Sequence, residues 1–227
     1  GFKFNQPVTR VVWPVSLQVL AFGFKFDQSL AGVQLPVSLL QLTLGGAFDQ
    51  PISKVRWPAS LIRLELGGQF DQPIDGVAWP ASLRELTFGW RFDHSLKEVE
   101  WPTSLQKLSI SGAFNQPIAR VTWPPVLETL IFGRNFDQPI AGVTWPGGLK
   151  TLTFGVEFNQ PISEVRWPAA LECLEFGGRF NQPITAVVWP ASLVDLKFGE
   201  DFSQLTDEVK WPRFLRELPW KSGNETL

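Results

Sequence analysis

The sequence predicts an all-β protein, a right-handed parallel β-solenoid of about ten coils, and three observations lead to this fold class. One motif recurs every 22 residues along the chain without an insertion or deletion. Each copy contains two short alternations of apolar and variable residues, which is the pattern of half-buried strands. Each alternation is followed by a proline or a glycine, the residues that close strands with turns.

A column of phenylalanines sets the register of the repeat. These phenylalanines stand at Phe4, Phe26, Phe48, Phe70, Phe92, Phe114, Phe136, Phe158, Phe180 and Phe202. Read from this position, the consensus is F-[ND]-Q-P-I-x-x-V-x-W-P-x-S-L-x-x-L-x-F-G-x-x. The valine column is complete from Val11 to Val209, and the tryptophan column from Trp13 to Trp211 has one substitution, Leu35. Columns that hold the same apolar residue in nearly every copy are predicted to lie in the core.

The two alternations, V-x-W before proline and L-x-F before glycine, are predicted to be two short strands in each coil. Period-two alternation sends the valine, tryptophan, leucine and phenylalanine to one interior. Twenty-two residues cannot bury their own apolar face, so the coils are expected to stack in parallel at about 4.8 Å. We expect prolines such as Pro14 to mark one corner, and glycines such as Gly23 to mark another through a positive φ.

We expect residues 1–227 to form a single solenoid domain, with residues 203–227 as a degenerate C-terminal capping coil and tail. In that coil Ser203, Leu205 and Thr206 replace consensus residues, and a polar tail follows. The chain starts abruptly at Gly1 inside the repeat pattern, from which we expect further sequence upstream.

Composition narrows the classes of partner. The formal net charge is -2, from 20 basic and 22 acidic residues. The chain therefore lacks the excess of positive charge with which proteins bind nucleic acids or anionic membranes. No apolar run approaches the roughly 20 residues of a membrane helix, so we expect a soluble chain without membrane insertion. The one cysteine, Cys173, excludes an intramolecular disulfide or a multi-cysteine zinc site and is consistent with a reducing compartment such as the cytoplasm.

The column after the phenylalanine is the sharpest candidate for chemistry. It contains Asn5, Asp27, Asp49, Asp71, Asp93, Asn115, Asp137, Asn159 and Asn181. Four consecutive aspartates could bind Ca²⁺ or, with a second acid, act in glycoside cleavage. Asparagine and aspartate share only a side-chain oxygen, so we interpret the column as caps of backbone N–H groups in Asx-type turns.

The remaining polar columns also have structural interpretations. The glutamine column is predicted to be an amide ladder in which each side chain bonds the next coil, and His94, the only histidine, replaces one member. Cys173 lies at an outward position beside Glu172 and Glu175, whose charges would raise the pKa of the thiol. The sequence therefore predicts no catalytic, cofactor-binding or metal-binding residue.

Outward columns of the second strand alternate in charge. One contains Arg63, Glu85 and Lys107, and its neighbour contains Glu128, Lys150 and Glu172. Opposite charges on adjacent strands support one another and leave no uniform potential for a charged ligand. Ice binding would need regular threonine ranks, and Glu65 and Ser109 interrupt them.

The string F-[ND]-Q-P-I at a 22-residue period resembles the FNIP repeat, a relative of the leucine-rich repeat. The stretch W-P-x-S-L-x-x-L-x-F-G-x-x-F is also similar to the residue pattern of bacterial BspA-like repeats. The resemblance spans nearly the whole chain and implies a leucine-rich-repeat-like solenoid of the kind found in protists and large viruses. In that family the repeats are sometimes attached to an F-box, where they would select a partner for ubiquitylation.

Exposed aromatic residues suggest where a partner would bind. The column two residues before the phenylalanine is glycine in four coils, yet it carries Phe24 and Trp90, with Arg91 adjacent. Aromatic and arginine side chains are common anchors of protein interfaces, so Phe24, Trp90 and Arg91 are candidate protein contacts. The alternative is that these aromatics cover a corner of the core.

We therefore predict a non-catalytic repeat scaffold that mediates protein–protein interaction, as a subunit of a larger assembly or as a substrate-selecting module. A protein partner is expected, with no small-molecule substrate and no cofactor. Two alternatives are a carbohydrate-active β-solenoid enzyme and a structural or ice-type surface protein. The enzyme would need a break in the repeat where polar residues converge.

Overall fold

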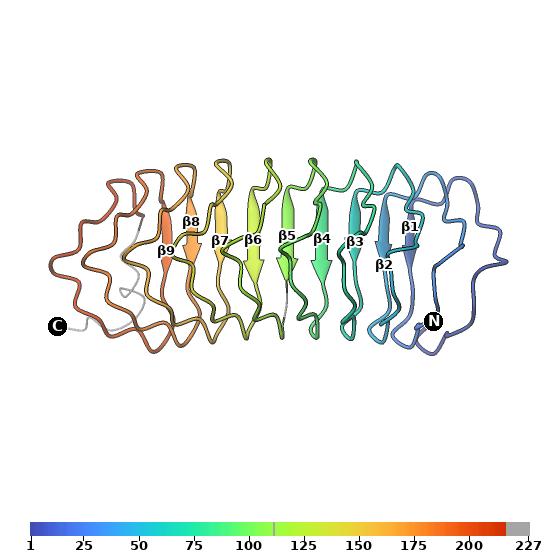
Figure 1. The fold of residues 1–227 in the computed structure, drawn as a ribbon, viewed down its shortest axis with the longest axis horizontal. Helices are drawn as coiled ribbons and strands as arrows, with labels where there is room; N and C mark the ends of the chain where they lie inside the picture. Colours follow the sequence, from blue (N-terminus) through green and yellow to red (C-terminus); the bar gives the residue numbers. More distant parts are fainter. Residues whose placement is uncertain (111, 217–227) are drawn as a thin grey trace.

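The computed structural model describes residues 1–110 and 112–216, which form a row of stacked coils that follows the sequence from one end to the other (Figure 1). One short strand is present in each of nine coils, and no helix occurs in these residues. The strands are Val19–Ala21 (β1), Gln41–Thr43 (β2), Arg63–Glu65 (β3), Glu85–Phe88 (β4), Lys107–Ile110 (β5), Thr129–Phe132 (β6), Thr151–Thr153 (β7), Cys173–Glu175 (β8) and Asp195–Lys197 (β9).

All nine strands form one parallel sheet in the order of the sequence, β1 to β9. Each paired strand residue lies opposite the residue 22 positions later, as Leu42 does with Leu64 and Leu64 with Leu86. The register of the sheet is therefore the register of the sequence repeat. This arrangement confirms the predicted all-β, parallel β-solenoid.

Stacked aromatic and leucine columns fill the interior. The phenylalanine column is 0% exposed from Phe26 to Phe180, and successive rings lie 6.0 to 6.3 Å apart and nearly parallel. The central leucine of each strand, such as Leu64, is also fully buried. No polar or charged residue among the described ones is buried, so this core is held by apolar packing along its whole length.

The coils are spaced more widely on the side away from the sheet. At the phenylalanines that follow the strands, ring centroids are 5.7 Å apart from Phe154 to Phe176 and 5.5 Å from Phe176 to Phe198. In the tryptophan column the separations are 6.3 to 6.5 Å. The stack is therefore curved, with the sheet on its inner side.

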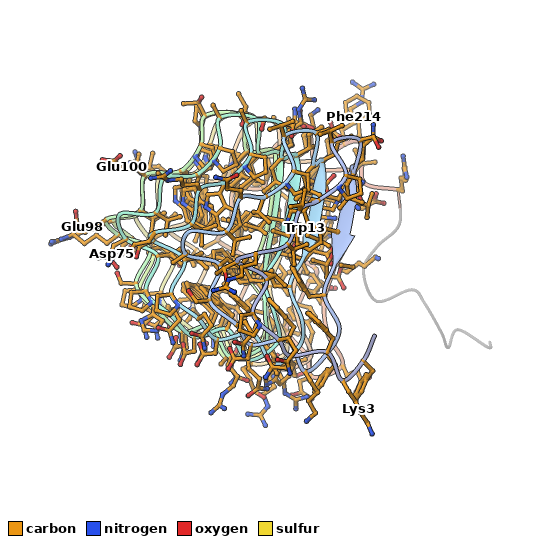
Figure 2. The ribbon with its side chains drawn as sticks, turned by 90° about the vertical axis from the view of Figure 1, so that its right-hand side faces the viewer. Lys3, Trp13, Asp75, Glu98, Glu100 and Phe214 are labelled. Atoms are coloured by element: carbon orange, nitrogen blue, oxygen red, sulfur yellow. The ribbon has the colours of Figure 1, made fainter. Side chains whose placement is uncertain are left out.

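The predicted V-x-W strand is wrong, because none of its residues belongs to a strand. A ladder of backbone hydrogen bonds needs strands about 4.8 Å apart, and the tryptophan side of the stack is wider than that. The predicted orientations are nevertheless confirmed: Val121 and Trp123 are 6% and 7% exposed. In Figure 2 Glu100, the variable residue of one V-x-W, projects outward on the side opposite β1.

The reason given for the glycine column is also wrong. Gly23 and its equivalents have no positive φ; within the described residues such glycines are Gly32, Gly76, Gly112 and Gly142. Instead, a Cβ at Gly155 would overlap the carbonyl oxygen of Gly133 in the preceding coil, and other members of the column make the same close approach. Glycine is needed there because two backbones meet between coils.

The expected cap is described only in part. Leu205 is 79% exposed and Phe214 65% exposed. The positions where the tenth coil would repeat the strand, together with Pro219, Trp220, Lys221 and the polar tail, lie outside the described residues, as does Ser111.

Candidate protein-interaction surface

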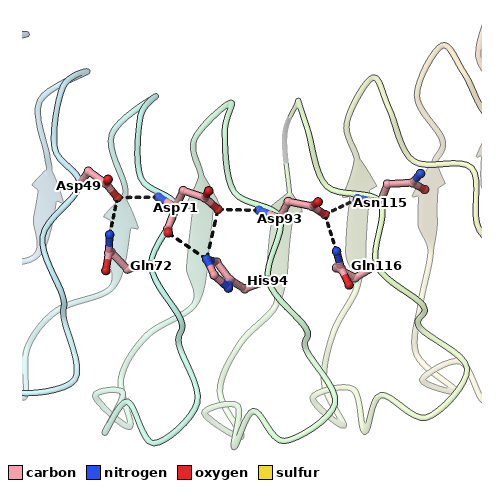
Figure 3. A network of polar contacts seen from close by, with 7 residues as sticks. All are labelled: Asp49, Asp71, Gln72, Asp93, His94, Asn115 and Gln116. Atoms are coloured by element: carbon pink, nitrogen blue, oxygen red, sulfur yellow. Dashed lines mark hydrogen bonds and ion pairs between the residues drawn. The ribbon is translucent and has the colours of Figure 1, made fainter.

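A network of side-chain oxygens and amides joins every coil to the next. The Oδ1 atom of Asp49 accepts hydrogen bonds from the backbone N–H of Asp71 and from Nε2 of Gln72, both at 2.9 Å (Figure 3). Parallel stacking brings residues 22 positions apart side by side. The asparagine and aspartate side chains therefore cap backbone N–H groups, as predicted, but those of the following coil and not of a local turn.

The glutamine column bonds from coil to coil, as predicted, and its acceptors are the side chains of the asparagine and aspartate column. From Gln28 onward, each glutamine amide of the column donates to the asparagine or aspartate of the preceding coil and not to another glutamine, as Gln182 Nε2 does to Asn159 Oδ1 at 3.0 Å. Asn159 also accepts the N–H of Asn181 at 2.9 Å. Asparagine thus makes the same two bonds as aspartate, and the ladder does not require a charge.

His94 takes the place of a glutamine in this network. Its Nε2 atom lies 2.8 Å from the backbone oxygen of Asp71 and 3.2 Å from Oδ1 of the same residue (Figure 3). A carbonyl oxygen only accepts hydrogen bonds, so Nε2 carries a proton and donates it. The prediction of a ladder histidine is confirmed.

Cys173 is partly buried on β8. Burial raises the pKa of its thiol above the ordinary value, and the hydrogen bond to Asp195 at 3.6 Å and the charge of Glu172 raise it further. The thiolate fraction at neutral pH is correspondingly small, which disfavours a role as a nucleophile.

Some outward charges of neighbouring coils form ion pairs at or next to the strands. Arg63 lies 2.9 Å from Glu85, and Lys150 lies 3.4 Å from Glu128. These two pairs are among the charge contacts that the sequence predicts. Across the residues that the structure describes, no group of three or more His, Cys, Asp or Glu could hold a metal ion.

The turn that follows each strand forms a corner of the coil, and its exposed aromatics lie on this corner. Phe24 is 47% exposed, stacks on Phe2 at 5.2 Å, and has Lys25 Nζ 5.6 Å from its ring centroid. Its ring lies over Gly46, where a Cβ would come within 2.5 Å of two ring carbons. Phe24 therefore has both a packing role and an exposed ring.

Trp90 lies on the same corner but has neither an aromatic ring stacked on it nor a cation over it. It is 56% exposed, and its indole makes no ring contact, hydrogen bond or cation–π contact with the described residues. Arg91 Nη1 donates to Gln69 Oε1 at 3.0 Å and forms no ion pair within that part of the chain. Phe24, Trp90 and Arg91 therefore share one corner, and Trp90 is the side chain that packing explains least.

The FNIP repeat profile matches residues 4–47, 26–69, 48–90, 92–135, 114–156, 136–166 and 158–201. The chain belongs to the FNIP repeat family. In this chain each FNIP repeat forms one 22-residue coil, and the coils join in a parallel sheet. No curated protein matches the chain.

Two solved structures have a similar fold. CroV588, described as a novel circular leucine-rich-repeat protein, is 37% identical with a TM-score of 0.81 over 95% of this chain. The match covers 35% of the length of CroV588. An internalin, InlF of Listeria monocytogenes, is 16% identical with a TM-score of 0.60 over 84% of this chain and 56% of its own, and shows the fold alone.

These likenesses place the FNIP repeats among leucine-rich-repeat folds, which commonly mediate contacts between proteins. In the described residues there is no helix with the length and apolar character needed to cross a bilayer.

Proposed function

We propose that this FNIP repeat chain is a non-catalytic scaffold that binds a protein partner, and that the corner bearing Phe24, Trp90 and Arg91 is its contact surface. The observation that supports the proposal is the exposure of Trp90. A 56% exposed tryptophan whose indole stacks on no other ring stands in a column where glycine serves the fold elsewhere, at Gly46 and Gly68 for example. Exposed tryptophan and arginine are frequent anchors of protein interfaces.

The polar side chains of the chain support a scaffold over an enzyme. In the described residues the asparagine, aspartate and glutamine columns bond from coil to coil, and His94 belongs to the same network. A carbohydrate-active enzyme would need two carboxyl groups that converge around a substrate. A scaffold of this kind suits a subunit of a larger assembly or a substrate-selecting module.

Replacing Trp90 with glycine tests the proposal. Because glycine occupies this column in other coils, we expect the free energy of unfolding to change by no more than about 1 kcal/mol. Capture of partner proteins from cells that make the protein should fall about tenfold, measured by quantitative mass spectrometry of pull-downs.

Val156→Gly is the matched control, since Val156 occupies the same column in a later coil and is also exposed. It should leave capture unchanged. Unaltered capture by Trp90→Gly, or a large loss of stability in that variant, would assign Trp90 to the packing of the corner.

A further inference from the structure

The corner has a flat floor between Phe24 and Trp90. Phe24 and Trp90 are three coils apart, and the two positions between them in the column are Gly46 and Gly68. The Phe24 ring leans over Gly46. A Cβ at Gly68 would meet only the carbonyl oxygen of Gly46, at 3.5 Å, so no side chain covers Gly68. We call the strip from Phe24 through Gly46 and Gly68 to Trp90 the aromatic corner.

Carboxylates border the middle of the aromatic corner. Asp49 and Asp71 each follow one of the two glycines by three residues, and Glu65 precedes Gly68 by three. Both aspartates use Oδ1 in the ladder between coils, and the second carboxylate oxygen makes no hydrogen bond within the described chain. The side chain of Asp71 is 44% exposed. Negative charge is therefore accessible beside the floor.

The cations of the aromatic corner lie at its two ends. Lys25 sits over the Phe24 ring, and Arg91 is bonded to the neutral amide of Gln69. The residues that correspond to Lys25 and Arg91 in the two middle coils are Ala47 and Gln69, which carry no charge. The middle coils thus have no lysine or arginine in this column, and the basic group nearest to Asp71 is His94, with Nε2 3.2 Å from Oδ1.

The later coils lack this combination. There Glu157 lies 4.0 Å from Arg134 and 2.5 Å from Arg179, so the carboxylate on that part of the corner is paired with arginines. Their ladder column holds Asn159 and Asn181, which make the ladder bonds without charge. Four consecutive aspartates and the exposed aromatics therefore coincide in one half of the solenoid, although the fold requires neither.

We infer that the aromatic corner receives a basic segment of a protein partner, with a lysine or arginine side chain against the exposed indole of Trp90. The inference rests on the proposed function of this corner. Aromatic faces attract cations, as Lys25 over Phe24 shows within the chain itself, and Asp49 and Asp71 supply the opposite charge. Phosphate groups or an acidic peptide would meet these carboxylates and be repelled.

Three fluorescein-labelled probes distinguish the classes of partner by fluorescence anisotropy: an arginine–glycine repeat peptide, its glutamate counterpart, and single-stranded oligouridine. The arginine peptide should bind more tightly than the other two. Trp90→Gly should weaken its binding about tenfold. The double variant Asp49→Asn, Asp71→Asn should weaken it about fivefold, and added salt should reduce the difference between wild type and this variant.

The double variant changes charge without disturbing the ladder, because Asn159 and Asn181 already make the same bonds. The double variant Asp137→Asn, Glu164→Gln, away from the aromatic corner, removes the same two charges as a control and should bind like the wild type. Preference for the glutamate peptide or for oligouridine, absence of binding to all three probes, or arginine-peptide binding that survives both variants would overturn the inference.

The pull-down with Trp90→Gly separates this failure from failure of the proposed function. Loss of partner capture in that variant, together with no preference for the arginine peptide, would retain the contact surface and reject its basic partner. Unchanged capture would reject the contact surface itself.

Discussion

At the scale of single residues, the side-chain oxygen of the ladder column is the polar feature that most directly joins the coils. Interchange of asparagine and aspartate predicts from sequence that the oxygen, and not the charge, has the structural role. The bonding partner could not be predicted in the same way. Asp71 caps Asp93, a residue 22 positions away, and that contact depends on how the coils stack and not on the local turn.

Asp71 allows the oxygen and the charge to be tested separately. Asp71→Ala removes the acceptor of the Asp93 N–H and a partner of His94, so we expect unfolding to become easier by about 1 to 3 kcal/mol. Asp71→Asn keeps the oxygen and should stay within about 0.5 kcal/mol of the wild type. Guanidinium unfolding followed by circular dichroism measures both changes. Equal losses would show that the carboxylate charge is required after all.

At the scale of the coil, two similar sequence patterns have different structures. V-x-W and L-x-F are both apolar alternations of three residues, and sequence predicts a strand for each. The structure forms a ladder only for L-x-F, because the curved stack brings backbones close on the sheet side and separates them on the tryptophan side. Curvature is a property of many coils packed together, so the pattern of one coil does not contain it.

The glycine column tests the close approach between coils. A Cβ at Gly155 would overlap the Gly133 carbonyl, so Gly155→Ala must push two coils apart, and we expect a loss of about 3 kcal/mol or more. A Cβ added at Gly147, on the outer side, would have no other atom within 4 Å, and the φ of this glycine is not positive. Gly147→Ala should be neutral or stabilising by up to about 1 kcal/mol. Similar thermal unfolding midpoints for the two variants would argue against the contact.

At the scale of the whole molecule, the constant 22-residue period predicts the order, direction and register of the sheet, and the apolar columns predict its core. The same regularity predicts the structural ladders but only part of the candidate site. Trp90 was identifiable from sequence because it breaks a glycine column. Asp49 and Asp71 were not, since the repeat pattern marks them only as members of the ladder column.

The regular stack also predicts how stability is distributed along it, which the tryptophan column tests. Trp123 is 7% exposed, stacks on Trp145 at 6.4 Å and meets Phe132 edge-on at 6.2 Å, whereas Trp13 is less buried. A cavity at Trp123 weakens the contacts with both neighbouring coils, so Trp123→Ala should cost about 3 to 5 kcal/mol and Trp13→Ala markedly less.

Trp123→Phe separates the ring from its polar group. The buried Nε1 of Trp123 has no acceptor among the described residues, so phenylalanine removes an unsatisfied donor while keeping most of the ring packing. We expect its cost to be less than half that of alanine, in guanidinium unfolding followed by circular dichroism. If Trp123→Ala and Trp13→Ala lost the same free energy, the coils would not be coupled to their neighbours. If Trp123→Phe lost as much as Trp123→Ala, a phenyl ring would not replace the contacts of the indole.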